Sequence, residues 1–228
     1  SHHYAERNDP KDASHFPYSL ENVDVKFSTG DNAAPWGAWR SVDHSVQGFF
    51  IESFIDELAH EAGQDPYQYR RRLLADDARS LAVLDAAAEM AGWTQPAGAR
   101  PRAIGIAIKK SFGTVVCEIA EVAIGADGSV RVPNVWVAAD PGLVINPNGF
   151  AQQMDSGVIH GLPAALYGEI TFRDGQVVQR NFLDYPMVKM ADCPRISVRI
   201  MESGARTGGA GEPATPPIAA AVANALFA

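Results

Sequence analysis

The chain has 228 residues, which fits one large domain or two small ones. Apolar residues make up 46% and charged residues 20%, the ordinary proportions of a folded protein, which excludes a disordered, collagen-like or disulfide-scaffold chain. With 27 acidic and 19 basic residues the formal charge is -8, a sign that repels phosphate backbones and argues against a nucleic-acid partner. No apolar run approaches the roughly 20 residues that span a bilayer, so we expect no transmembrane segment in this chain.

The two ends of the chain are unusual. It begins with Ser1-His2-His3, which is typical of a tag remnant or a cut point, and no signal peptide stands there. The run from 213 to 228 stops without a glycine cap or a polar tail. We therefore expect both ends to be cuts within, or boundaries of, something larger.

The chain is expected to divide into three regions. Residues 1–35 are polar and form an irregular lead-in with one strand, at Val23–Phe27. Residues 36–94 are helical and begin with a Trp/Gly turn at Trp36–Arg40. Residues 95–228 form an α+β region that carries the glycine-rich loop described below.

The first helix follows the Trp/Gly turn and ends at Gly63, a C-terminal cap residue. Apolar residues recur in it at spacings of three and four, which predicts one buried face. We expect Glu52, Asp56 and Glu57 to face away from the core. The predicted buried set is Phe50, Phe54, Ile55, Leu58 and Ala59.

Two shorter helices are predicted next. Asp65-Pro66 opens the first of them, with aspartate as N-cap and proline in the first turn. Its run Arg70-Arg71-Arg72 is interpreted as a solvated helix face. The other helix has Ser80 as its expected N-cap and ends at Gly92.

After a Pro/Gly/Arg linker the apolar period changes from helical to strand-like. Asp127-Gly128 joins two of the predicted strands as a hairpin, and Asp174-Gly175 predicts a second hairpin. Asn146-Pro147 precedes a helix, and Pro213 is expected to begin the final one. The predicted strands are 103–108, 115–124, 130–138 and 196–201, and the helix after Asn146-Pro147 runs from about 150 to 166.

Helices gathered first and strands later predict an α+β fold rather than a doubly wound sheet. We expect a helical N-terminal region beside a mixed β-sheet with packed helices. The two cysteines, Cys117 and Cys193, form no CxxC pair and cannot by themselves hold zinc or an iron–sulfur cluster. Cys117 lies among apolar residues and is interpreted as a buried, inert thiol, while a disulfide between the two stays open.

The segment Thr207–Pro213 is the first candidate for chemistry. Its glycines, Gly209 and Gly211 among them, allow close approach to a ligand and positive φ. If Pro213 begins a helix, Glu212 lies at or next to its N-cap, where the dipole favours the ionised carboxylate of a general base. The alternative is an acid that only stabilises the start of a helix.

Two other positions carry groups that suit a cofactor. The amide of Gln153, in the pair Gln152-Gln153, can both donate and accept hydrogen bonds, although helix glutamines are usually solvated. The guanidinium of Arg40 suits an oxygen-rich ligand, but an arginine beside Trp39 is equally often a packing pair. His44 could carry a proton or simply occupy the start of a helix. No metal-ligand spacing, phosphate-binding GxxxxGK[ST] loop, strand–GxGxxG–helix unit or GxSxG elbow is present.

Several motifs, taken together and in order, resemble the xanthine dehydrogenase family of molybdenum hydroxylases, most of all the beta (large) subunits of the isoquinoline 1-oxidoreductase type. The resemblance runs from about Val23 to the C-terminus. The matching stretches are Trp39–Ser45, Phe50–Ala59, Asn146-Pro147 with Gln153-Met154, Gly161–Ile170, Asn181–Tyr185 and Gly209–Ala219.

The resemblance implies roles at matching positions. Glu212 would be the general base that takes a proton from the oxygen nucleophile during hydroxylation of an N-heterocycle or aldehyde. Gln153 would hydrogen-bond the pterin of the molybdenum cofactor, and Arg40 would begin the loop near the metal. Gly209 and Gly211 would help to bind the cofactor. The chain itself would supply no metal ligand.

The chain also departs from the family pattern. Ser41-Val42-Asp43-His44 replaces the glycine- and phenylalanine-rich loop of xanthine dehydrogenases, which argues against a purine substrate. The Gly-Gln-Gly cofactor motif is missing, so the chain resembles only the later portion of such a subunit and would need its remainder.

The resemblance further implies a molybdopterin cofactor in the cytosine dinucleotide form and [2Fe-2S] clusters on a partner subunit. It favours a periplasmic location. The alternative function is a non-catalytic fragment for complex assembly or cofactor delivery.

Overall fold

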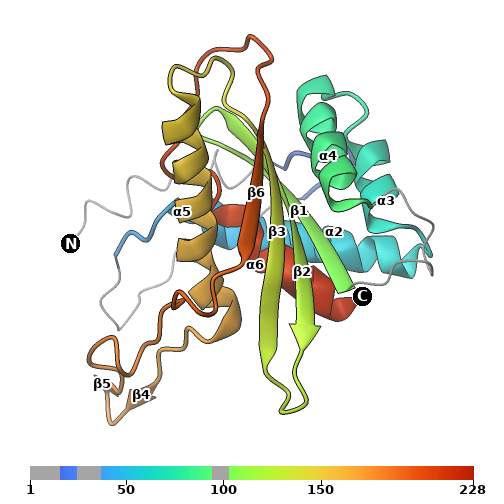
Figure 1. The fold of residues 1–228 in the computed structure, drawn as a ribbon. Helices are drawn as coiled ribbons and strands as arrows, with labels where there is room; N and C mark the ends of the chain where they lie inside the picture. Colours follow the sequence, from blue (N-terminus) through green and yellow to red (C-terminus); the bar gives the residue numbers. More distant parts are fainter. Residues whose placement is uncertain (1–15, 25–36, 94–102) are drawn as a thin grey trace.

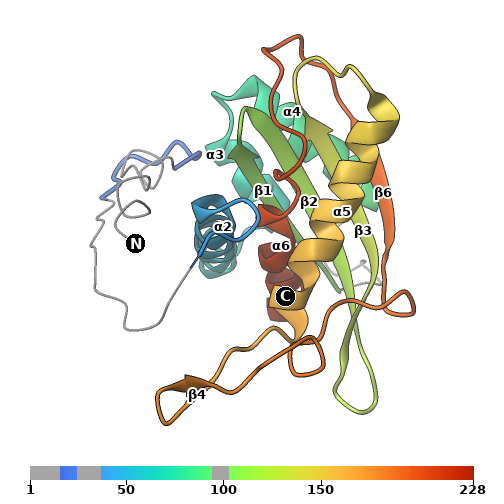
Figure 2. The same ribbon diagram turned by 90° about the vertical axis from the view of Figure 1, so that its left-hand side faces the viewer.

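The computed structural model describes residues 16–24, 37–93 and 103–228, and it has the expected α+β arrangement (Figure 1). Helices cover both faces of a mixed sheet, as Figures 1 and 2 show. Its helices are α2 (Asp43–Glu61), α3 (Pro66–Leu73), α4 (Ala78–Ala91), α5 (Pro147–Leu166) and α6 (Pro216–Phe227). Its strands are β1 (Ala103–Ser111), β2 (Thr114–Ile124), β3 (Val130–Asp140), β4 (Phe172–Arg173), β5 (Gln176–Val177) and β6 (Arg195–Ile200).

The main sheet of the described chain has the order β1-β2-β3-β6. The first three strands are antiparallel, and β6 joins β3 in parallel. The predicted hairpin at Asp127-Gly128 is confirmed, with Gly128 at φ 80°. A second tight turn joins β1 to β2 at Phe112-Gly113, where both residues have positive φ (51° and 79°), as a two-residue primed turn requires.

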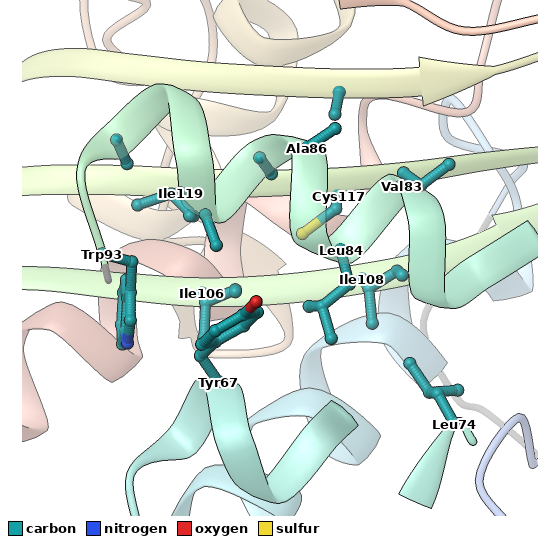
Figure 3. Close-up of a cluster of buried hydrophobic side chains, with 14 of the residues drawn as sticks. Tyr67, Leu74, Val83, Leu84, Ala86, Trp93, Ile106, Ile108, Cys117 and Ile119 are labelled. Atoms are coloured by element: carbon teal, nitrogen blue, oxygen red, sulfur yellow. The ribbon is translucent and has the colours of Figure 1, made fainter. Parts of the chain in front are cut away.

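One sheet face packs against α2, α3 and α4. Alternate residues of β1 and β2 point to this face because side chains alternate along a strand. Figure 3 shows the cluster, in which Tyr67 and Trp93 flank the strand residues. Its strand members are Ile104, Ile106, Ile108, Val115, Cys117, Ile119 and Ala138. Cys117 is buried as predicted, burial raises the pKa of its thiol, and both cysteines are free.

The opposite face packs against α5 and α6. Here Gly105 permits close approach, because a Cβ at this position would lie 2.2 Å from the main-chain oxygen of Ala221. Glycine therefore allows α6 to lie directly on β1. The apolar members of this core include Ala107, Val116, Ala120, Val135, Val137, Ala139, Met154, Val158, Ile218 and Val222.

The predicted buried face of the first helix is partly wrong. Ile55 and Ala59 are buried, but Phe50 and Phe54 are 64% and 54% exposed, while Glu52 and Asp56 are buried. The charged pair turns inward because the fully buried Arg70 of α3 neutralises it, with Nε 3.0 Å from the Glu52 carboxylate and Nη1 2.7 Å from Asp56. Arg70 is therefore no part of a solvated face, whereas Arg72 is exposed.

The final helix begins at Pro216, with Thr215 as N-cap, and not at Pro213. Proline has no N–H, so Pro216 and Pro217 could not make the i→i−4 bonds of a helix that began at Pro213. They are tolerated in the first turn, where the N–H would be unpaired anyway. Glu212 therefore lies in a turn before the helix.

Other helix ends agree more closely with the sequence. Asp65 caps α3 by accepting from the N–H groups of residues 67 and 68, and Asn146 caps α5. The N-cap of α4 is Asp77 and not Ser80, because the Asp77 carboxylate accepts from both the N–H and the hydroxyl of Ser80. Gly92 ends α4 in the left-handed conformation, as expected.

The second predicted hairpin, β4–β5, is short and stands away from the main sheet (Figures 1 and 2). Most of the strand expected at Val23–Phe27 lies outside the described residues. Among the helices that the structure describes, none combines the length and apolarity needed to cross a membrane. The three-region division of the chain stays a prediction.

Candidate active site

The glycine-rich loop rests on the turn between β1 and β2. The N–H of Gly209 donates to the carbonyl of Phe112 at 2.7 Å, and the Thr114 hydroxyl donates to the Gly209 carbonyl at 2.5 Å. A Cβ at Gly208 would lie 2.5 Å from Thr114 Oγ1. Close packing on the β1–β2 turn thus requires glycine at positions 208 and 209. Contrary to expectation, neither they nor Gly211 has positive φ.

Arg40 joins this loop to α5. Its Nε and Nη2 donate to the carbonyl of Gly211, the former at 2.7 Å. Its Nη1 donates to the Ser156 carbonyl at 3.1 Å and the Ser156 hydroxyl at 2.9 Å, and Nη2 also reaches Gln153 Oε1 at 3.4 Å. Burial lowers the pKa of Arg40, against the opposing charge of Glu212. The guanidinium of Arg40 thus links the main chain of the glycine-rich loop to α5.

Glu212 is half-buried, and Ser41 contacts it twice. The main-chain N–H of Ser41 donates to Glu212 Oε1 at 3.0 Å, and the Ser41 hydroxyl donates to the Glu212 main-chain carbonyl at 2.5 Å. Among the described residues, no side chain or N–H donates to Oε2. One carboxylate oxygen is therefore fixed, and the other can accept a proton.

Gln153 lies on the exposed side of α5, beside Gly211. Its Oε1 faces Arg40, and its Nε2 makes no hydrogen bond with any part of the chain that the structure describes. A Cβ at Gly211 would lie 3.7 Å from Gln153 Oε1, an ordinary contact, so packing does not require glycine there. An exposed amide donor beside an unobstructed glycine fits a polar, planar group such as a pterin edge.

The histidines near the site are held by aromatic rings. His44 meets Phe112 edge-on at 4.9 Å between centroids, and His160 lies 5.2 Å from Trp39. Burial, and then the nearby charge of Arg40, lowers the pKa of His160 and favours the neutral imidazole. Trp39 thus packs on His160, while the Arg40 beside it binds the loop.

The fold therefore brings together four of the residues that were predicted from the sequence, namely Arg40, Gln153, Gly211 and Glu212. Gly209 is instead hydrogen-bonded through its main chain to the β1–β2 turn. Sequence reasoning missed the contact of Ser41 with Glu212. Ser41 was visible in the Trp-Arg-Ser motif, but nothing local to it indicated a partner 171 positions away.

The glycine-rich loop presents a carboxylate beside an exposed glutamine, an arrangement that fits a cofactor-binding domain. A family model described as "molybdopterin cofactor-binding domain" matches residues 81–194, half of the chain. The chain belongs to this family, and the resemblance to molybdenum hydroxylases inferred from its motifs is confirmed.

Two curated relatives agree with this assignment. One component of the nicotinate dehydrogenase of Pseudomonas putida is 31% identical, over 92% of this chain and 19% of its own length. The beta chain of isoquinoline 1-oxidoreductase of Brevundimonas diminuta is 32% identical, over 78% of this chain and 23% of its own length. The chain thus spans about a fifth of these relatives.

A solved structure shares the fold. Aldehyde oxidoreductase of Desulfovibrio gigas superposes with a TM-score of 0.63 over 84% of this chain and 39% of its own, at 13% identity. Identity this low supports the fold alone, and it agrees with the α+β class.

Proposed function

We propose that this chain carries the catalytic base and part of the cofactor-binding surface of a molybdenum hydroxylase that oxidises an N-heterocycle or an aldehyde. The observation that supports this most directly is the hydrogen bonding of Glu212. Ser41 holds one of its carboxylate oxygens, and the other has no donor among the described residues. The names of both curated relatives, which refer to nicotinate and isoquinoline, favour a heterocycle.

The molybdenum cofactor, when bound, supplies the two-electron oxidant, and water supplies the oxygen that enters the product. Glu212 Oε2 accepts the proton of the attacking oxygen as a general base. Its half-buried position limits competing water. Gln153, next to Gly211, would help to hold the pterin with its exposed amide hydrogens.

Arg40 keeps these groups together. Its guanidinium contacts Gly211, Ser156 and Gln153 at once, so the loop and α5 move as one unit. Fixed geometry of this kind provides much of the rate enhancement when two groups must meet within about 3–3.5 Å. Arg40 therefore serves the cofactor by placing Gln153 and the loop.

The proposal includes partners that this chain does not contain. The remainder of the molybdopterin-binding subunit would complete the cofactor site, because the chain spans about a fifth of its relatives. The cofactor would have the cytosine dinucleotide form, an iron–sulfur subunit with [2Fe-2S] clusters would take up the electrons, and the complex would lie in the periplasm.

The test compares wild type, Glu212→Gln and Glu57→Gln in the assembled complex that contains this chain. Glu57 is exposed on α2 and serves as the matched control. Molybdenum content and dye reduction are measured with a heteroaromatic acid and with an aromatic aldehyde. We expect molybdenum in all three and a loss of turnover of about a thousandfold in Glu212→Gln alone. Absence of molybdenum, or full activity without the carboxylate, would overturn the proposal and favour an assembly fragment.

A further inference from the structure

We infer that Ser41 is the positioning residue of the site, which sets the direction of the Glu212 carboxylate so that Oε2 meets the proton it accepts. This inference rests on the proposed role of Glu212 as a base. It assigns a function to a side chain that touches neither substrate nor cofactor.

The two Ser41–Glu212 hydrogen bonds fix different parts of the glutamate. The hydroxyl, at 2.5 Å from the main-chain carbonyl, holds the backbone of Glu212. The N–H, at 3.0 Å from Oε1, holds the carboxylate. With both ends of the side chain fixed, its rotation is limited, and Oε2 keeps one direction. A hydrogen bond to an ionised acceptor is also stronger than a neutral one.

The conformation of Ser41 supports this role. Its side chain is fully buried, and its φ is +72°, followed by +43° at Val42. A non-glycine residue in this region is strained, and such strain persists only where the surroundings over-determine it. The contacts on both sides do so, since Val42 N–H donates to the Trp39 carbonyl at 2.9 Å and the Ser45 hydroxyl donates to the Arg40 carbonyl at 2.9 Å.

Other neighbours of Glu212 do not duplicate this function. Arg40 reaches the carbonyl of Gly211, one residue earlier, and acts on the carboxylate only through its charge. The N–H of Thr215 donates to the Glu212 main-chain oxygen at 3.0 Å and leaves the side chain untouched. Within the described residues, the hydrogen bond from Ser41 is the one that ends on the carboxylate.

The test uses Ser41→Ala and Ser41→Gly in the assembled, molybdenum-containing complex. Both remove the hydroxyl that anchors the Glu212 main chain and keep the Ser41 N–H, so they test whether this anchor is needed to hold the carboxylate against that N–H. Glycine also relieves the strain at positive φ, so it remains informative if alanine folds poorly. We expect kcat to fall about 10- to 100-fold in both, with KM within about twofold, because the base is misplaced while substrate binding is kept. Ser80→Ala, a buried serine at the start of α4 whose hydroxyl bonds to Asp77 and not to the glycine-rich loop, is the matched control and should retain wild-type kcat.

A double-mutant cycle separates positioning from general stability. If Ser41 acts through Glu212, adding Ser41→Ala to Glu212→Gln lowers the single-turnover rate no further. Hydrogen exchange should become faster in peptides covering 207–215 of Ser41→Ala and stay unchanged in Ser80→Ala. A further fall in the double variant, or wild-type kcat in both Ser41 variants while Glu212→Gln is inactive, would overturn this inference alone. Full activity of Glu212→Gln would instead overturn the proposed function.

Discussion

The carboxylate of Glu52 on α2 accepts a hydrogen bond from the main-chain N–H of Ile108 on β1, with 3.0 Å between Oε2 and nitrogen. Because β1 is an edge strand of the described sheet, its outward N–H and C=O groups face no strand among residues 16–24, 37–93 and 103–228. Asn224 of α6 donates to the carbonyl of Ile106 at 2.9 Å on the same edge. The two helices thus pair these two main-chain groups of the edge, and Arg70 supplies the counter-charge that Glu52 needs there.

The first prediction concerns Arg70. Arg70→Met leaves Glu52 and Asp56 buried without a counter-charge, so the free energy of unfolding should fall by about 3–5 kcal/mol. Urea denaturation measures this change. Arg72→Met is the control, since the exposed Arg72 only stacks on the Tyr69 ring at 4.8 Å and its loss should cost about 0.5–1 kcal/mol. Equal losses in the two variants would contradict the assignment.

A second prediction follows from Glu118 on β2. Its side chain is fully buried, and neither carboxylate oxygen has a hydrogen-bond partner in the described part of the chain. Burial raises its pKa well above the ordinary 4.5. The folded state therefore holds a proton that the unfolded state releases, so stability is fully present below about pH 4.5 and declines as pH rises towards the folded pKa.

Glu118→Gln should remove this pH dependence. We expect the variant to match the wild type near pH 4 and to exceed it in the free energy of unfolding at pH 8, with a difference that grows in between. Denaturation in urea at several pH values measures both curves. Glu57→Gln, a change on the exposed side of α2, should leave the slope as it is. Parallel curves for wild type and Glu118→Gln would show that the acid is ionised in the fold.

The glycine-rich loop allows a third prediction. Gly211→Ala adds a methyl group that makes only an ordinary contact, 3.7 Å from Gln153 Oε1, so the melting temperature should stay within about 2 °C of wild type, since surface changes are usually within about 0.5 kcal/mol. If the cofactor approaches the backbone there, molybdenum content should fall. Gly208→Ala drives a methyl group against Thr114 and should lower the melting temperature by several degrees. An unchanged molybdenum content in Gly211→Ala would remove Gly211 from the binding surface.

A fourth prediction concerns the fork of Arg40. Arg40→Lys keeps the charge but cannot reach Gly211 and Ser156 together. Loss of the donors to the Gly211 carbonyl and the Ser156 hydroxyl should cost about 1–3 kcal/mol and reduce cofactor retention. Thermal unfolding and molybdenum content report the two effects. Arg173→Lys, on the exposed β4–β5 hairpin, should change neither. If Arg40→Lys kept the melting temperature and the molybdenum content of wild type, a positive charge alone would be enough at this position.

Much of the fold could be predicted from the sequence because its signals are local. Asp65 before proline, Asn146 before proline, and Asp127-Gly128 each act through bonds spanning a few residues. The inward turn of Glu52 could not be predicted, because helical periodicity treats every acid as solvent-facing and the neutralising Arg70 lies on another helix. Pro213 alone predicts the start of α6 three residues too early, because Pro216 and Pro217 are tolerated only in the first turn.

The candidate site was predictable only in its parts. Local chemistry indicated Glu212, Gln153 and Arg40 separately, and each had an ordinary structural alternative. Their ordered resemblance to a family joined them, and the fold then brought them together. The contact from Ser41 lay beyond both approaches, because it depends on a positive φ and on a partner far along the chain.

The bonds from Arg40 to Gly211 and from Ser41 to Glu212 each span 171 positions. At a ribosomal rate of about 5–20 residues per second, the loop before α2 emerges roughly 10–30 s before the segment that it binds. During that interval α2 also lacks α6, against which it packs in the finished fold. The contacts of Arg40 and Ser41 with the glycine-rich loop should therefore be among the last features of the fold to form.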